Sequence, residues 1–390
     1  MKKEKVLYLT SRLPYPPVGG DKLRTYNILK ILAKKYDVNL VVITDEVMDN
    51  ETEIALQKYT QELKVFSKPK YRFYINTLKF LINSLPLQVN YYYFNDVQKH
   101  IDNVLEKVDL CVSNLVRTTQ YLENTSKPKY LDMVDSIGLN YQASKEHVVS
   151  FFWKSIYNVE TDRLLTYEKN CVKNFTNTFL VNKYESEYWS KFGNVTWVPN
   201  GVNKELFTYD KKDNKYSNHI AFFGKMDYQP NVDAVMWFID NVLKDIDKNL
   251  KFIIIGTRPN QHILELSTKY DNIEITGFVD DPFEILNSVL TVVAPMQTGG
   301  GIQNKILESM ALGTINIVSS LGAKPIVGAE DKEHLFVCDN GSDVSKLIND
   351  IYKDKDKYQY IKNNSRNLIK KCYTWEECEN TLFKITGDIK

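Results

Sequence analysis

The sequence contains few of the residues that mark unstructured or crosslinked chains. Glycine and proline are sparse, at 16 and 12 of 390 residues, while 43% of the residues are hydrophobic and 25% are charged. These proportions exclude a disordered, collagenous or low-complexity chain. The five cysteines are scattered, and none forms a Cys-x-x-Cys pair. They therefore predict neither a disulfide framework nor a zinc ribbon.

Neither sign of charge predominates, because 50 Lys and Arg residues are matched by 49 Asp and Glu residues. A dedicated nucleic-acid-binding protein usually has a clear basic excess, so we expect no nucleic-acid partner. The sequence also lacks an apolar run of the ~20 residues that cross a bilayer. The apolar stretch behind Met1–Lys5 is too short for an export signal. We therefore expect a cytoplasmic protein.

Strand and helix patterns alternate along the chain. The apolar runs Val6–Thr10 and Val38–Ile43, with the helical stretch Asp21–Lys35 between them, predict a strand–helix–strand unit. After the charged stretch Tyr209–Lys215, which has the pattern of a linker, the alternation restarts at His219–Phe223. A chain of this length exceeds what one hydrophobic core usually fills. The pattern predicts an α/β fold with two Rossmann-like, doubly wound domains that face each other across a cleft.

The segment Ala294–Gly313 carries the most chemical information. Its glycines, Gly299–Gly301, allow a backbone to approach a ligand closely, and the helix predicted from Ile302 begins with unpaired amide donors. On that helix Lys305 and Glu308 lie opposite the apolar face. A cation in the first turn opposes the helix dipole, so Lys305 indicates an anionic ligand. The Glu308 carboxylate suits the two hydroxyls of a ribose.

Other candidates follow neighbouring strands of the second domain. Lys225 comes directly after the strand-ending Gly224, and Arg258 and Val279 follow the next two strands. The carboxyl ends of parallel strands meet at one edge of a sheet, and ligands bind outside that edge. We therefore expect the Lys225 ammonium beside the glycine-rich helix entrance. The backbone of Val279 is expected to pair with a nucleobase, with Arg258 near it.

Four segments together resemble the GT-B-fold retaining glycosyltransferases of family four, also called group 1 glycosyltransferases. They are Pro16–Gly20, Pro199–Asn203, Lys305–Gly313 and Tyr373–Glu376. The resemblance extends over nearly the whole chain, and the segments are specific jointly rather than singly. It indicates a subgroup with a Gly-Gly-Gly-Ile-Gln-Asn-Lys variant of the donor-site motif.

The resemblance implies a division of labour along the chain. Residues 1–205 would form an acceptor-side domain, and residues 206–374 a domain that binds the nucleotide sugar. Residues 375–390 would form a helix that crosses back to the first domain. The expected donor-binding residues are Gly19, Gly20, Lys225, Arg258, Val279, Gly300, Gly301, Ile302, Lys305 and Glu308.

In the family, Glu308 would hold the donor ribose, and Lys225 and Lys305 would lie near the diphosphate. The pair Gly19-Gly20 would close over the donor phosphate or face the acceptor. The sequence also departs from the family pattern. Gly300 occupies the position of the first of two glutamates, and Lys225 stands where arginine is common.

A second departure concerns the first domain. The family often has a histidine after its fourth strand, and Ser113–Arg117 contains none. The nearest carboxylates are Asp132 and Asp135, in and just after the next predicted strand. We expect Asp135 to act on the acceptor side, and the alternative is a helix cap. The expected catalytic residues are thus Lys225, Lys305 and Asp135.

The segment 64–95 is locally basic. It holds five Lys or Arg residues and no acid, interleaved with aromatic residues. Such a segment can lie among anionic lipid headgroups, although an ordinary domain surface is the alternative. We expect peripheral contact with the inner face of the cell membrane through these residues.

The sequence thus predicts a hexosyltransferase that moves a sugar from a UDP or GDP donor to a saccharide or lipid-linked acceptor in surface-polysaccharide assembly. Retention of stereochemistry is implied by the resemblance. We expect no cofactor and no metal, because the histidines are dispersed and Asp280-Asp281 suits a loop cap better than a cation. The alternatives are a catalytically silent GT-B subunit, a nucleotide-sugar 2-epimerase, or a solute-binding protein, which should carry an export signal.

Overall fold

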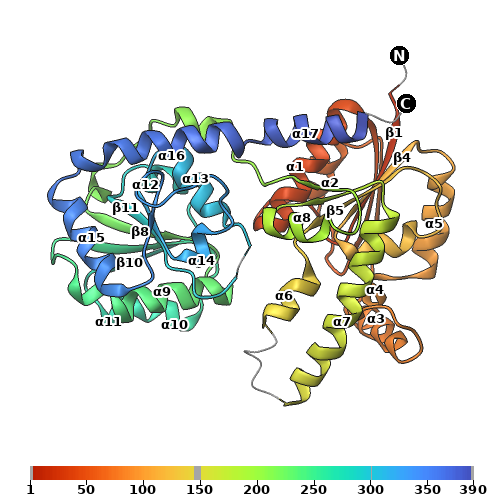
Figure 1. The fold of residues 1–390 in the computed structure, drawn as a ribbon, viewed down its shortest axis with the longest axis horizontal. Helices are drawn as coiled ribbons and strands as arrows, with labels where there is room; N and C mark the ends of the chain where they lie inside the picture. The colour runs from red at the N-terminus through yellow and green to blue at the C-terminus, as the bar shows by residue number, and fades with distance from the viewer. Residues whose placement is uncertain (1–2, 145–150, 300, 388–390) are drawn as a thin grey trace. The chain divides into compact units, whose positions relative to one another are not determined.

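The computed structural model describes residues 3–144, 151–299 and 301–387. The chain divides into two compact units (Figure 1). Unit 1 comprises Met1–Pro199 and Thr381–Lys390, and unit 2 comprises Asn200–Asn380. The first crossing between units therefore lies at residue 199, whereas the sequence analysis placed it at residue 205.

Unit 1 contains a seven-stranded sheet in the order β3-β2-β1-β4-β5-β6-β7, with every pair parallel. Its central strands are buried along almost their whole length, because helices cover the sheet. The strands are β1 Lys5–Thr10, β2 Asp37–Thr44, β3 Glu62–Ser67, β4 Leu110–Asn114, β5 Lys129–Val134, β6 Asn177–Leu180 and β7 Val195–Trp197.

The helices of unit 1 connect these strands as a doubly wound fold requires. They are α1 Gly20–Lys35, α2 Asn50–Gln57, α3 Lys70–Thr77, α4 Leu87–Tyr92, α5 Asn95–Leu105, α6 Ile137–Ser144, α7 Phe151–Asn174 and α8 Lys183–Trp189. Short 3₁₀ turns, η1 Leu78–Leu81 and η2 Val116–Leu122, complete the connections. Figure 1 shows α3 beside α4, away from the strands.

Unit 2 repeats the pattern with a six-stranded parallel sheet in the order β10-β9-β8-β11-β12-β13. The strands are β8 His219–Phe223, β9 Lys251–Ile255, β10 Ile273–Gly277, β11 Thr291–Ala294, β12 Asn316–Val318 and β13 Phe336–Val337. The helices are α9 Gln229–Asn241, α10 Gln261–Leu264, α11 Leu266–Lys269, α12 Pro282–Leu286, α13 Asn304–Leu312, α14 Ser320–Ala323, α15 Gly341–Lys353 and α16 Gln359–Cys372. In Figure 1, α9, α10 and α11 lie on one side of this sheet and α12, α13 and α16 on the other. The predicted pair of doubly wound α/β sheets is confirmed.

The predicted linker Tyr209–Lys215 is wrong, because this stretch belongs to unit 2. The Tyr209 hydroxyl donates to the Asp281 carboxylate at 2.7 Å, and the Lys211 ammonium lies 3.2 Å from the same carboxylate. Asp281 stands at the N-cap position of α12 without capping it. Its side chain instead ties the charged stretch to the domain.

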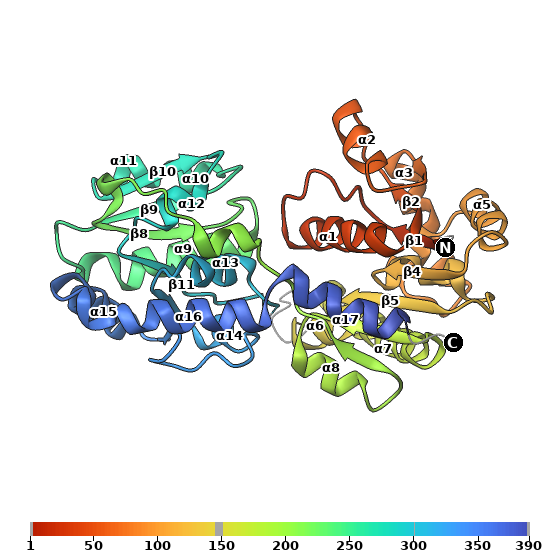
Figure 2. The same ribbon diagram turned by 90° about the horizontal axis from the view of Figure 1, so that it is seen from above.

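The last helix, α17 Trp375–Gly387, starts in unit 2 and ends in unit 1 (dark blue in Figure 2). Near its end, the Tyr36 hydroxyl donates to the Thr386 hydroxyl at 2.8 Å, and both groups are buried. The chain therefore returns to unit 1 after completing unit 2.

Candidate active site

The loops at the carboxyl ends of β8, β9 and β10 are joined by backbone hydrogen bonds. The Gly224 amide donates to the Ile255 carbonyl at 3.0 Å, and the Gly256 amide donates to the Gly277 carbonyl at 3.2 Å. A Cβ on Gly256 would lie 1.7 Å from the Gly224 carbonyl oxygen. Only glycine allows this approach. The backbone of the three loops is therefore hydrogen-bonded side by side along one edge of the sheet.

Helix α13 begins at Asn304, two residues later than the predicted start at Ile302. The reason is Gln303, whose side-chain amide turns back to the carbonyls of Gly299 and Gly301, at 3.3 and 3.2 Å. No side chain caps the helix. Its first amides are therefore available to a ligand, which is the arrangement that binds anions at helix N-termini.

Lys305 is buried, with 8% of its surface exposed. Its ammonium lies 4.3 Å from the centre of the Phe222 ring and 3.9 Å from the Met296 sulfur, and it donates to the Asn231 side-chain carbonyl. Burial lowers the pKa of Lys305 to about 7, and no carboxylate opposes this shift. The helix pattern predicts Lys305 opposite the apolar face, and in the structure its side chain is buried there. Loops at the strand ends cover this side of α13, and a helical sequence pattern contains no information about them.

Gly224 is what allows this ammonium to be placed there. A Cβ on Gly224 would lie 2.7 Å from the Asn231 amide nitrogen and 3.2 Å from the Lys305 ammonium nitrogen. Asn231, near the start of α9, also donates from its amide to the Lys225 carbonyl at 2.9 Å. Asn231 is a site residue that the sequence did not predict, although it follows a proline at a helix start.

Glu308 lies one turn beyond Lys305 on the same helix and is half-buried. Burial raises the pKa of its carboxyl to about 7. Within the described residues it makes no hydrogen bond and no ion pair. A desolvated carboxylate without donors is costly to the free protein and is suited to accept hydrogen bonds from a ligand.

Lys225 and Arg258 are brought together by Asp227. The Lys225 ammonium lies 3.2 Å from the Asp227 carboxylate, and the Arg258 guanidinium lies 3.7 Å from it. Lys225 is partly exposed and Arg258 largely exposed. Unlike Lys305, Lys225 therefore has a carboxylate beside it that balances part of its charge.

The remaining donor-site candidates lie in loops of unit 2. Val279, after β10, is half-buried, and no described residue bonds to its backbone amide or carbonyl. Gly301 and Ile302 are half-buried and lie just before Gln303, the N-cap residue of α13. Gly300 lies outside the described residues.

Three of the four segments that carry the family resemblance meet in unit 2. The Asn200 amide donates to the Asn304 side-chain carbonyl at 3.0 Å, at the start of α13. The Val202 amide donates to the Tyr373 carbonyl at 2.8 Å. Between them, a Cβ on Gly201 would lie 2.2 Å from the Trp375 amide nitrogen. Residues 199–203 therefore pack between the start of α13 and the start of α17 and contact both.

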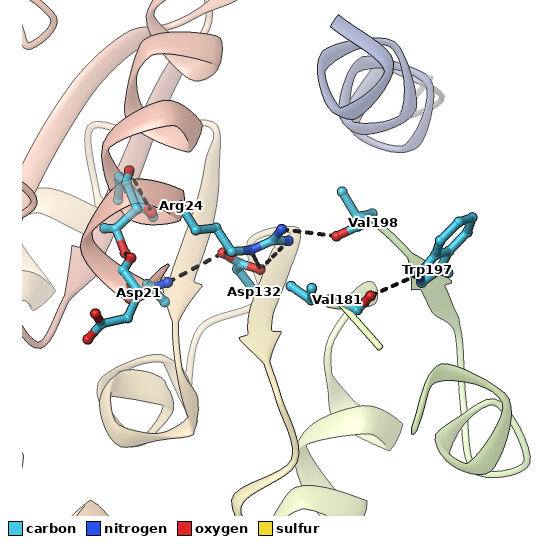
Figure 3. Close-up of polar contacts among 9 residues, drawn as sticks. Asp21, Arg24, Asp132, Val181, Trp197 and Val198 are labelled. Atoms are coloured by element: carbon cyan, nitrogen blue, oxygen red, sulfur yellow. Dashed lines mark hydrogen bonds and ion pairs between the residues drawn. The ribbon is translucent and has the colours of Figure 1, made fainter. Parts of the chain in front are cut away.

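In unit 1, Gly19 and Gly20 are exposed at the N-terminus of α1. Gly19 has a φ of 97°, a conformation that favours glycine, and its position leaves the first amides of α1 without a side-chain cap. The next turn of α1 carries Arg24, whose guanidinium forms a fork with the Asp132 carboxylate at 2.7–3.0 Å. Arg24 also donates to the Val198 carbonyl at 2.9 Å (Figure 3). This fully buried ion pair joins α1 to β5 and to the chain leaving β7.

Asp135, one residue after β5, lies in a cluster of carboxyl groups that the sequence did not predict. One of its oxygens is buried without a hydrogen-bond partner. The Ser136 amide donates to Glu185 at 2.7 Å, and the Ser136 hydroxyl donates to Glu168 at 2.6 Å. Burial raises the pKa of Asp135, that of Glu168 to about 7 and that of Glu185 to about 8. The three groups come from distant parts of the chain, and their proximity leaves no mark in a local pattern.

This cluster predicts a pH-dependent stability. A carboxyl whose pKa is higher in the folded than in the unfolded protein stabilises the fold below its unfolded value, and this contribution is lost as the pH rises through the folded value. Glu185→Gln keeps an acceptor for the Ser136 amide and removes the charge. We expect its free energy of unfolding to exceed that of the wild type by about 1–3 kcal/mol at pH 8, and the difference to shrink toward pH 5.

Urea unfolding from pH 5 to pH 8 measures this difference. Glu187→Gln, on the exposed face of the same helix, is the matched control and should run parallel to the wild type. Parallel curves for wild type and Glu185→Gln would contradict the prediction.

Comparison with known proteins identifies the class of the domain. Residues 217–354, most of unit 2, match the family model described as "Glycosyl transferases group 1". No curated protein matches the sequence.

Solved glycosyltransferases are similar to the whole chain. The Anabaena protein Alr3699/HepE, solved with UDP, is 14% identical over 99% of this chain and 100% of its own, with a TM-score of 0.71. Sucrose-phosphate synthase from Thermosynechococcus elongatus is 13% identical over 99% of both chains, also with a TM-score of 0.71. WaaG, a glycosyltransferase involved in lipopolysaccharide biosynthesis, is 12% identical over 98% of this chain and 100% of its own, with a TM-score of 0.68.

The chain therefore has the GT-B fold, as predicted. Residues 217–354 of its second unit match the group 1 glycosyltransferase domain.

Proposed function

We propose that the protein transfers a hexose from a nucleotide-diphosphate donor, UDP or GDP, to a saccharide or lipid-linked acceptor in the assembly of a surface polysaccharide. The reaction would retain the anomeric configuration and need no metal. The observation that carries the proposal is the pair of side chains on α13: among the residues that the structure describes, the buried Lys305 has no counter-charge and the half-buried Glu308 carboxyl has no donor.

Each of these side chains lacks what a nucleotide sugar contains. A diphosphate would supply the negative charge that Lys305 lacks, and its arrival would raise the pKa of the ammonium and hold it in the protonated form. Ribose hydroxyls would supply the donors that Glu308 lacks. The free backbone groups of Val279 suit the edge of a nucleobase, and Arg258 and Lys225 would form the outer rim.

The chemistry follows from where charge develops. As the bond from the sugar to the diphosphate breaks, the leaving phosphate oxygen becomes more negative. The Lys305 ammonium and the uncapped amides of α13 are fixed donors that would stabilise this charge as it appears. Lys305 is the proposed principal catalytic residue, and Lys225 acts from a more solvated position.

On the acceptor side, we assign Asp135 the role of receiving or holding a proton near the acceptor hydroxyl. Its buried oxygen without a hydrogen-bond partner among the described residues supports this role, and burial raises the pKa of its carboxyl. Gly19 and Gly20, at the uncapped start of α1, are proposed to contact the donor phosphate or the acceptor.

The relatives support a uridine nucleotide and a polysaccharide product. Alr3699/HepE has been solved with UDP, with UDP and glucose, and with UDP-glucose. TarM from S. aureus has been solved with UDP and α-GlcNAc-glycerol, and WaaG takes part in lipopolysaccharide biosynthesis.

A thermal-shift screen tests the proposal directly. We expect UDP or GDP at a hundred times its dissociation constant to stabilise the folded protein by about 2.7 kcal/mol, which corresponds to a rise in Tm of about 3 °C for a chain of 390 residues that unfolds as one unit. The matching nucleoside monophosphate should give a smaller rise, because it cannot place a second phosphate near Lys305. Equal shifts with mono- and diphosphates, or no shift, would contradict the donor site.

The alternatives are separated by product analysis with the nucleotide sugar that binds best. Transfer to an acceptor or slow donor hydrolysis identifies a glycosyltransferase, and an inverted C2 centre on the sugar identifies an epimerase. Binding without turnover identifies a silent subunit, the outcome suggested by Gly300 at the position of a family glutamate.

A further inference from the structure

Helix α3 exposes a stripe of apolar residues of the kind that usually faces a protein core. Tyr71, Tyr74 and Ile75 are spaced i, i+3 and i+4, which places them on one face of α3, and Leu78 follows at the start of η1. Their side chains are 57–63% exposed. The following residues, Leu81 and Ile82, are 70% and 86% exposed. We call these six exposed apolar residues the apolar ridge.

The ridge faces solvent because the opposite side of α3 is anchored. Phe73 is fully buried, and its ring centre lies 4.9 Å from that of Tyr91, 5.5 Å from that of Tyr92 and 4.9 Å from that of Phe94. The Asn76 amide donates to the Tyr93 carbonyl at 2.9 Å. A helix fixed in this way cannot turn the ridge inward without losing the aromatic cluster.

Six strongly exposed apolar residues within one stretch of twelve are unusual on a domain surface, and exposed apolar patches mark interaction sites. Its surroundings indicate the chemistry of the partner. Lys70 and Arg72 are exposed on the same helix and form no ion pair with any described residue. Residues 63–95 contain no Asp or Glu. An anionic lipid bilayer has negative headgroups at its surface and apolar acyl chains just beneath. Unpaired cations beside apolar residues are complementary to such a surface.

We propose that the apolar ridge inserts into the interface of an anionic membrane, with Lys70 and Arg72 among the headgroups. This inference rests on the proposed function. It adds that the acceptor of the sugar is lipid-linked. Among the helices that the structure describes, none is long and apolar enough to cross a membrane. Contact would therefore be made by the short α3 helix and the turn that follows it, lying along the surface.

Flotation of the full-length protein with vesicles tests the proposal without nucleotide or acceptor, so its failure is separate from failure of the donor site. We expect binding to vesicles of equal parts phosphatidylglycerol and phosphatidylcholine, and weak binding to phosphatidylcholine alone. The double variant Lys70→Glu/Arg72→Glu should bind the anionic vesicles about 30-fold more weakly or worse. Leu81→Ser/Ile82→Ser should lose at least about tenfold, because it removes the most exposed apolar side chains.

The matched control is Val47→Ser/Ile54→Ser, which changes two apolar residues of unit 1 that are 87% and 70% exposed but lie outside the ridge. It should bind like the wild type, and circular dichroism should give the same melting curve for all variants. Absence of binding even at low salt, or equal binding by all variants, would overturn the proposal. So would a dimer in sedimentation velocity that Leu81→Ser/Ile82→Ser abolishes, because a second copy of the chain would then be the occupant.

Discussion

Lys305→Met is expected to lower the rate of sugar transfer about 10²–10³-fold while making the ligand-free protein more stable. The loss follows from removing a fixed charge next to the leaving phosphate, which is the size of effect seen when one preorganised donor is lost. The gain follows from burial. The folded pKa of Lys305, about 7, lies below its ordinary value, so the lysine destabilises the fold increasingly as the pH falls from that ordinary value to about 7, and fully below it. Methionine fills the same space without a charge, and we expect it to add about 1–3 kcal/mol to the free energy of unfolding at pH 6.

Steady-state kinetics with the best donor and urea unfolding at pH 6 measure the two effects. Lys248→Met, at an exposed position of unit 2, is the control and should change neither. A Lys305→Met variant with undiminished turnover would remove Lys305 from the site. A variant that loses both activity and stability would make the lysine structural.

Glu308→Ala is expected to weaken binding of the nucleoside diphosphate about 100-fold, and Glu308→Gln about tenfold. The carboxylate can accept two charge-assisted hydrogen bonds from ribose, each worth about 1.5–3 kcal/mol, and glutamine keeps only one neutral acceptor. The folded pKa of Glu308, about 7, lies above its ordinary value, so its destabilising effect grows as the pH rises toward that value. The glutamine variant should therefore be more stable than the wild type at pH 8.

Isothermal titration with the diphosphate and with its 2′-deoxy analogue separates the ribose contact from other effects. The wild type should lose affinity for the deoxy analogue, whereas Glu308→Ala should bind both ligands equally. Glu284→Ala, on the neighbouring helix α12, is the control and should bind like the wild type. Equal discrimination by wild type and Glu308→Ala would place the ribose elsewhere.

Much of the fold could be predicted from the sequence, because the central strands are continuous apolar runs and the helices between them have clear starts. Two strands, β3 and the two-residue β13, were not predicted, and both are edge strands of their sheets. β3 alternates exposed and half-buried residues, including Glu62 and Lys64. Its pattern resembles that of a surface segment. The linker was misplaced because charge alone does not distinguish a free connection from a segment held by Tyr209 and Asp281.

The donor-site helix was identified, but the environment of its residues was not. A helical pattern gives the direction of Lys305 from the helix axis and contains nothing about the loops after β8 and β11 that bury it. The pairing of Lys225 with Asp227 was accessible in principle, since the two residues are neighbours in the sequence. The grouping of Asp135 with Glu185 depends on two strands and two helices packing together, which no local pattern contains.

Unit 1 is formed from two stretches of the chain, its beginning and its end, and this affects the order in which the unit is synthesised. Translation completes all of Asn200–Asn380 before Thr381 emerges, a delay of about 10–40 s at ordinary elongation rates. Throughout that interval the earlier-made half exists without its final helical segment, and the Tyr36 hydroxyl has no Thr386 to bond. Unit 1 is therefore complete only after the carboxyl-terminal residues have been synthesised. A chain that ends before Thr381 would lack part of unit 1, although the rest of unit 1 is synthesised first.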